Sequence, residues 1–160
     1  MNTIKQMPGD ARTWVYQSNT ILTETQVNTI IQKGRAFIEG WAAHGAPLNA
    51  SFDILYNRFI IIAVDEKQAM ASGCSIDKSV AFIKSVEQEF GLHLLDRMQV
   101  AYRKADAIEV CSLSEFEKLA NNGAVNAATI VFNNMITTKA GFDSDWEVPL
   151  KGSWQSRVLR

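Results

Sequence analysis

Residues 50–65 read ASFDILYNRFIIIAVD, and this segment sets the class of the fold. It predicts two strands, Ala50–Tyr56 and Phe59–Asp65, joined by a tight connection at Asn57-Arg58 to form a β-hairpin. The second strand is apolar on both faces, so it is predicted to lie in the interior of a sheet. The chain is therefore expected to contain a β-sheet with a buried central strand.

A strand and a helix precede this hairpin. Trp14–Gln17 is rich in residues that favour strands. Thr23 and Gln26 have the spacing of a capping box, and apolar residues then recur at helical spacing as far as Trp41. The helix is predicted to stop at Gly45, which suits a left-handed C-terminal cap.

A second helix follows the hairpin. It is predicted to begin at Cys74 or Ser75 and to end at Gly91, and a fourth strand is expected around Met98–Tyr102. The order β-α-β-β-α-β is the split βαβ arrangement of ferredoxin-like folds, in which two helices cover one face of an antiparallel sheet. We therefore predict a single α+β domain over residues 1–160 with a ferredoxin-like core.

A β-α-β extension and a C-terminal tail follow this core. The extension contains predicted strands at Ile108–Cys111 and Thr129–Phe132, with a short helix between them that starts where Ser112 and Glu115 have the capping-box spacing. The tail, Phe142–Arg160, holds Trp146 and Trp154. An aromatic tail of this kind either packs on the core of its own domain or anchors a partner subunit in a homo-oligomer. Both alternatives remain open from the sequence.

The composition disfavours several classes of protein. Sixteen basic and seventeen acidic residues give a formal charge of −1, so no global field attracts polyanions, and nucleic acid is not an expected partner. The longest apolar run, Phe59–Val64, is far shorter than the ~20 residues of a membrane-spanning helix. Met1–Asp10 has no apolar signal core, so a cytoplasmic location is predicted. Cys74 and Cys111 lack metal-binding spacing, so no metal is expected and both are predicted to be free thiols.

Five stretches of the chain resemble a family of small bacterial proteins of similar length that commonly carries the label ABC transporter ATPase. The similarity spans nearly the whole chain and implies a small bacterial protein of this family. The stretches are Trp14–Gln17, Trp41–Gly45, Arg58–Ile62, Ser72–Val80 and Val131–Asn134.

The ATPase label fails a test on the residues themselves. A nucleotide-binding subunit needs a Gly-x-x-x-x-Gly-Lys-[Ser/Thr] loop, whose backbone amides surround the phosphates. Lys78 and Ser79 follow Gly73, but Asp77 stands where the second glycine is required. The resemblance therefore implies membership of the family and not the activity.

The start of the second predicted helix is the leading candidate site. Backbone N–H groups at a helix start favour an anionic ligand, and a cysteine there can act as a thiolate nucleophile or redox group. In the alternative interpretation the polar side chains only cap the helix and the cysteine packs as a small hydrophobic residue. The residues concerned are Ser72, Gly73, Cys74, Ser75, Asp77 and Lys78.

Nucleophilic catalysis at Cys74 would need a base, and the chain has only two histidines. His93 lies a helix length from Cys74, roughly 25 Å at 1.5 Å per residue, so His44 is the candidate catalytic partner. In the alternative interpretation His44 contacts the carbonyls at the end of its own helix.

The remaining charged residues have simpler interpretations. Adjacent strand residues point to opposite faces, so Asp65-Glu66 is predicted to be a solvated turn rather than an acid/base or metal pair. Asp53, Arg58 and Arg97 are predicted to form surface ion pairs.

Two functional hypotheses follow. In the first, the protein binds a small anionic ligand at Ser72–Lys78, with Cys74 as a reactive thiol. In the second, it is a non-enzymatic interaction module that associates through a sheet edge or through the tail that holds Trp146 and Trp154.

Overall fold

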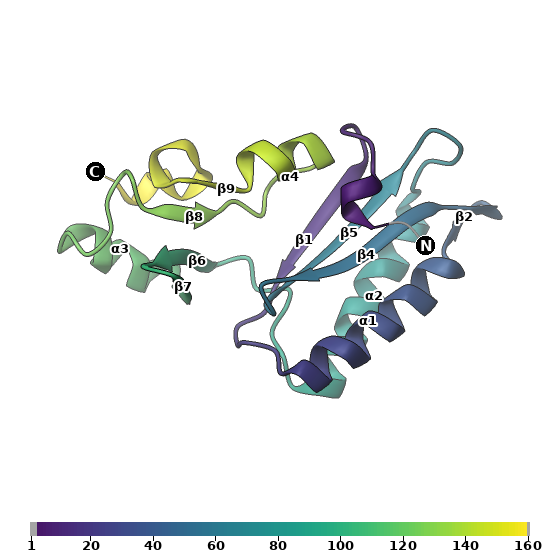
Figure 1. Ribbon diagram of the computed structural model, residues 1–160, viewed down its shortest axis with the longest axis horizontal. Coiled ribbons are helices and arrows are strands. Elements are labelled where there is room, and N and C mark those ends of the chain that lie inside the picture. The colour runs from purple at the N-terminus through teal and green to yellow at the C-terminus, as the bar shows by residue number, and fades with distance from the viewer. Residues whose placement is uncertain (1–2, 160) are drawn as a thin grey trace.

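The computed structural model describes residues 3–159 and arranges them as two β-sheets, with two long helices packed on the first sheet (Figure 1). All strand pairs are antiparallel. The first sheet has the order β1 (Arg12–Gln17), β5 (Phe59–Asp65), β4 (Asn49–Leu55). The second has the order β7 (Ala107–Ser112), β6 (Gln99–Lys104), β8 (Ile130–Phe132), β9 (Glu147–Pro149). A separate small hairpin pairs β2 (Ala42–Ala43) with β3 (Ala46–Pro47).

The helices begin at side-chain caps that the sequence predicts. Thr23, Ser72 and Ser112 each accept a hydrogen bond from the backbone N–H three residues further on, and each belongs to a reciprocal capping box. Gly91 has φ 65° and caps the second long helix, as predicted. The helices are α1 (Glu24–Glu39), α2 (Gly73–Phe90), α3 (Leu113–Asn121) and α4 (Lys139–Asp145), and the 3-10 turns are η1 (Ile4–Gln6), η2 (Leu150–Gly152) and η3 (Trp154–Val158).

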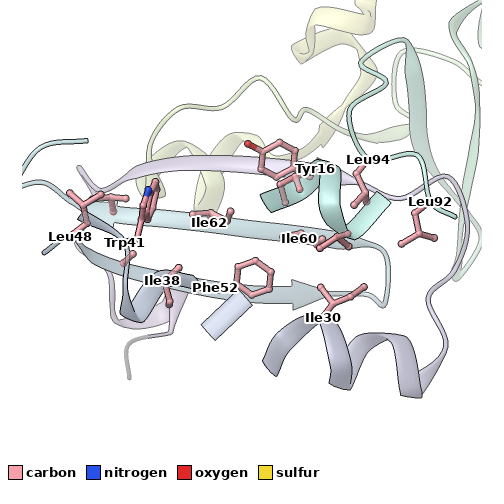
Figure 2. Packing of buried hydrophobic residues seen from close by; sticks show 14 of the residues in the cluster. Tyr16, Ile30, Ile38, Trp41, Leu48, Phe52, Ile60, Ile62, Leu92 and Leu94 are labelled. Carbon is pink, nitrogen blue, oxygen red and sulfur yellow. The ribbon is translucent and has the colours of Figure 1, made fainter. Parts of the chain in front are cut away.

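Strand β5 is buried on both faces, which confirms the predicted central strand. Ile60 and Ile62 face α1 and α2, where they pack with Phe52 in one core (Figure 2). Phe59 and Ile61 lie on the opposite face, in a second core that the second sheet and the C-terminal segment cover. All four of these β5 side chains are fully buried. The first sheet is thus the middle layer of the molecule.

Helix α1 ends earlier than predicted. Its C-cap is Gly40, and Trp41 already belongs to the approach to β2, where the indole Nε1–H donates to the carbonyl of Ser75 at 2.8 Å. Gly45 does not cap a helix. It has φ +79° and forms the β2–β3 turn with His44, which has φ +51°. The helical spacing of apolar residues extends to Trp41 because Trp41 packs into the same core from outside the helix.

The β4–β5 connection lies one residue earlier than predicted. Tyr56 and Asn57 both have positive φ, 55° and 52°, and the N–H of Arg58 donates to the carbonyl of Leu55 at 3.1 Å. Two consecutive positive φ values match the twist of a two-residue hairpin turn. The Arg58 side chain is buried and donates to the carbonyl of Ser18 at 3.3 Å, so its predicted surface ion pair is wrong.

The side chain of Tyr56 links this turn to the second sheet. Its hydroxyl donates to Glu147 Oε2 at 2.7 Å, and Arg103 Nε donates to Glu147 Oε1 at 2.7 Å. The Arg103 guanidinium also lies 5.1 Å from the centre of the Tyr56 ring. These contacts join the β4–β5 turn to β6 and β9.

The α+β class is confirmed, whereas the ferredoxin-like arrangement is not. The first sheet has the strand order that a split βαβ unit gives to its first three strands. In that arrangement the fourth strand would lie beside β1, but β6 pairs with β7 and β8 in the second sheet. The outer edge of β1 is left for another part of the chain.

The C-terminal tail packs on the domain itself through Trp146. This side chain is 3% exposed and is stacked with or edge-on to the rings of Tyr56, Phe59, Phe132 and Phe142. Trp154 is half-buried beneath the Arg157 guanidinium, 5.2 Å from the ring centre. For Trp146 the structure thus favours self-packing over a partner. Within residues 3–159, no helix combines the length and apolar character needed to span a membrane.

Candidate functional site

The predicted site at Ser72–Lys78 forms the start of α2. The Ser72 N–H donates to Ser75 Oγ at 2.7 Å, and the Ser75 N–H donates to Ser72 Oγ at 3.2 Å, so both hydroxyls serve the helix cap. Ser75 is 1% exposed. The side chains of Cys74, Asp77 and Lys78 are exposed, as is Gly73.

The structure does not join Cys74 to His44. Both side chains are exposed, and His44 lies in the β2–β3 turn rather than at a helix end. Within residues 3–159 no hydrogen bond or ion pair is formed by either side chain, and no cavity described below is lined by residues 72–78. The catalytic roles of Cys74 and His44 therefore stay predictions.

The two cysteines are expected to differ in reactivity. Cys74 is exposed, whereas burial, together with the nearby Glu115 and Glu109, raises the pKa of Cys111 to about 11. At pH 8 only about one Cys111 in a thousand would be a thiolate, so we expect alkylation of Cys111 to be at least about tenfold slower than that of Cys74. Timed modification with iodoacetamide followed by peptide mass spectrometry measures both rates, with Cys74→Ser and Cys111→Ser as controls. Equal alkylation rates at Cys74 and Cys111 would contradict the raised pKa of Cys111.

Cavities with charged and polar residues among their lining residues occur elsewhere, along the outer edge of β1. The Thr13 N–H donates to the Thr137 carbonyl and the Lys139 N–H donates to the Ala11 carbonyl, both at 2.9 Å, so one end of this edge is paired. Backbone groups alternate along a strand, so those of Val15 and Gln17 point to the same outer side. Among the residues that the structure describes, no backbone hydrogen bond covers that part of the edge.

Two adjoining cavities occupy this position, and we call them together the edge groove. The outer cavity has a volume of about 260 Å³ and the inner one about 30 Å³. Their linings share Val15, Arg97, Asn134 and Met135, so the two cavities lie side by side. The groove lies where the fourth strand of a ferredoxin-like sheet would have paired with β1.

The outer cavity has two cationic side chains and no carboxylate in its lining. Arg12 lies with its guanidinium carbon 5.2 Å from the centre of the Trp14 ring, which fixes the cation at the edge of β1. Arg97 comes from the connection between α2 and β6 and is exposed. In residues 3–159 neither arginine forms a salt bridge, so the surface ion pair predicted for Arg97 is wrong. Among the described residues Asp53 likewise forms no ion pair, and its carboxylate accepts the N–H of Ile4 at 2.7 Å.

The inner cavity contains a buried acceptor without a donor. Gln155 lies in η3 and is 2% exposed. Its Nε2 donates to the carbonyl of Phe132 at 3.1 Å, which fixes the orientation of the amide. Its Oε1 has no hydrogen-bond partner among the residues described. Buried polar atoms in native proteins are nearly always satisfied, so this unpartnered acceptor is an exception.

A chain of hydrogen bonds holds the wall between the two cavities. Trp146 Nε1 donates to Asn134 Oδ1 at 2.9 Å, and Asn134 Nδ2 donates to Gln17 Oε1 at 2.9 Å. The buried indole therefore orients Asn134, and Asn134 orients the Gln17 side chain. The groove is positioned by the same tail that covers the second core.

Sequence reasoning missed this site. The groove combines β1, the α2–β6 connection, the segment after β8 and η3, which are far apart along the chain. Arg12 and Gln155 have no motif around them, and Asn133-Asn134 after a strand resembles an ordinary turn. The only signal was the quoted resemblance, which includes Asn134.

Comparisons with protein-family models, curated proteins and solved structures found no match to this chain. Among residues 3–159 there is also no group of three or more His, Cys, Asp and Glu side chains that could hold a metal ion. The site must therefore be interpreted from its own geometry.

Proposed function

We propose that this protein binds a small anionic molecule in the edge groove. The observation that carries the proposal is the pair Arg12 and Arg97, which line one outer cavity that has no carboxylate in its lining. Guanidinium groups bind carboxylates and phosphates through several charge-assisted hydrogen bonds, and they remain charged at every physiological pH. Thr137 from the same lining is exposed and provides a further hydroxyl group.

The size and position of the groove support this function. Its combined volume is close to the lower limit of about 300 Å³ for small-molecule pockets, so the ligand is small. The chain as a whole has a formal charge of −1, so the attraction is local to these two arginines and not a property of the whole surface. Met135 is 59% exposed at the rim, and its flexible side chain can adapt to an occupant.

Removal of the two charges tests the proposal. We expect Arg12→Gln and Arg97→Gln each to weaken anion binding about tenfold, because a hydrogen bond to a charged group contributes about 1.5–3 kcal/mol. The probes are inorganic phosphate and a panel of small carboxylates, phosphate esters and sulfonates, titrated while amide NMR spectra are recorded.

Lys78→Gln is the matched control, because it removes one exposed positive charge from the other predicted site. It should leave binding in the groove unchanged. If anions instead shift the amides of residues 72–78 and Lys78→Gln abolishes the effect, the ligand binds at the start of α2 and the edge groove is wrong. If no probe of the panel binds, the proposed function is wrong altogether.

Association through a sheet edge is the second candidate, favoured by one observation. Strand β7 ends the second sheet, and within residues 3–159 no strand pairs with its outer side. Unpaired edges are templates for pairing with another chain. A monomeric mass in solution at high concentration would rule out a homo-oligomer formed in this way. Membership of the small bacterial family, a ferredoxin-like relationship and the cytoplasmic location stay predictions.

A further inference from the structure

We infer that the ligand of the edge groove also carries a hydrogen-bond donor, in the simplest case an ammonium group, which Gln155 Oε1 receives in the inner cavity. The ligand would then be a small zwitterion, with its anionic group at Arg12 and Arg97 and its donor at the other end. This inference rests on the proposed anion site and adds the chemical class of the ligand.

The Gln155 amide has a fixed orientation. Its Nε2 is engaged by the Phe132 carbonyl at 3.1 Å, so a rotation that exchanged the two amide atoms would place two oxygens against each other. The unpartnered atom is thus an acceptor. An acceptor on a side chain that is only 2% exposed, in the lining of a cavity, selects a donor, and it repels a second anionic oxygen.

The side chains around the inner cavity include a carboxylate. Asp96 also lines the inner cavity, where its two carboxylate oxygens accept from the Met98 N–H at 2.9 Å and from Gln99 Nε2 at 3.2 Å. Each carboxylate oxygen has lone pairs for more than one donor, so Asp96 still attracts a cation. Arg12 lines only the outer cavity and Asp96 lines only the inner one, while Arg97 lines both. A molecule with an anionic and a cationic end matches this polarity.

The inner cavity is small. A volume of about 30 Å³ accommodates a group as large as one or two water molecules, each of which needs at least about 10–15 Å³. An ammonium or amino group fits that space. Small amino acids, aminoalkyl sulfonates and aminoalkyl phosphates share the required chemistry.

An ordered water molecule is the competing occupant, since it would also donate to Gln155 Oε1. Matched pairs of probes separate the two: taurine against ethanesulfonate, and 3-aminopropyl phosphate against propyl phosphate. Each pair differs in the amino group and shares its anionic end. We expect the amino compound of each pair to bind the wild-type protein at least about tenfold more tightly, as measured by calorimetry or NMR titration.

Asp96→Asn is the principal variant, because it removes the negative charge from an exposed side chain and keeps an oxygen that can accept from Met98. It should reduce the advantage of the amino compounds over ethanesulfonate and propyl phosphate. Gln155→Met should do the same. Its thermal unfolding is measured in parallel, because the Nε2 bond to Phe132 is lost with the acceptor.

The outcomes are distinct. If both members of each pair bind equally well to the wild-type protein, water occupies the inner cavity, and the inference is overturned while the proposed anion site stands. An amino preference that persists in both Asp96→Asn and Gln155→Met would also overturn it, because the donor then binds elsewhere. If neither member of either pair binds, while other anions of the panel do, the zwitterion class is wrong. If no anion binds, the proposed function falls as well.

Discussion

Trp146→Ala is expected to lower the free energy of unfolding by about 3–5 kcal/mol, the usual range for deleting a buried aromatic side chain. The indole is 3% exposed. Its ring centre lies 4.6 Å from that of Phe142 and 5.0 Å from those of Phe59 and Phe132, so the substitution removes the centre of an aromatic cluster. Urea unfolding followed by circular dichroism measures the change.

Two further variants show whether the position or the residue type matters. Trp154→Ala removes a half-buried tryptophan from the same tail and is expected to have a much smaller effect. Trp146→Phe keeps much of the packing but loses the Nε1 bond to Asn134. It should therefore disturb the edge groove, while it lowers the free energy of unfolding less than Trp146→Ala does. A larger loss of stability for Trp154→Ala than for Trp146→Ala would show that the tail is held differently.

Gly34→Ala is expected to destabilise the protein by about 1–3 kcal/mol, the range for overpacking a core, although alanine favours helices by about 1 kcal/mol. A Cβ atom on this buried helical residue would lie 2.2–2.4 Å from three ring atoms of Phe52. Phe52 is 1% exposed and packs edge-on against Phe82, with ring centres 5.8 Å apart, so the ring has little room to move.

Gly73→Ala is the matched control for this variant. Gly73 is also helical, but a Cβ added there would meet no atom within 4 Å among its described surroundings, so the substitution should be neutral or slightly stabilising. Adding Phe52→Leu to Gly34→Ala should recover part of the loss, and a double-mutant cycle measures the coupling between the two positions. If Gly34→Ala is as stable as the wild type, the close contact is not a constraint.

The features that the sequence predicts correctly are local ones. The caps at Thr23, Ser72 and Ser112 depend on residues three positions apart, and the central position of β5 follows from its own apolar faces. The helical spacing also places Gly34 on the inward face of α1, where it is buried. The reason for a glycine there could not be predicted, because it depends on the Phe52 ring from another strand.

The features that were missed depend on long-range pairing. Residues 98–102 predict a strand, but nothing in them distinguishes pairing with β1 from pairing with β7 and β8. The edge groove exists because β6 pairs with β7 and β8 and leaves the outer edge of β1 open. Its polar residues Arg12, Arg97 and Gln155 look like isolated surface side chains until the fold brings them to one edge.

The second core has a consequence for the order in which the protein is assembled on the ribosome. Phe59 and Ile61 are synthesised long before Phe132 and Trp146, which cover them. The first sheet and its two helices can therefore associate while the opposite face of β5 is still bare and exposed to other chains. Closure of that face and completion of the edge groove are the same late event, because Trp146 takes part in both. A nascent chain has no complete edge groove until its hydrophobic surface is covered.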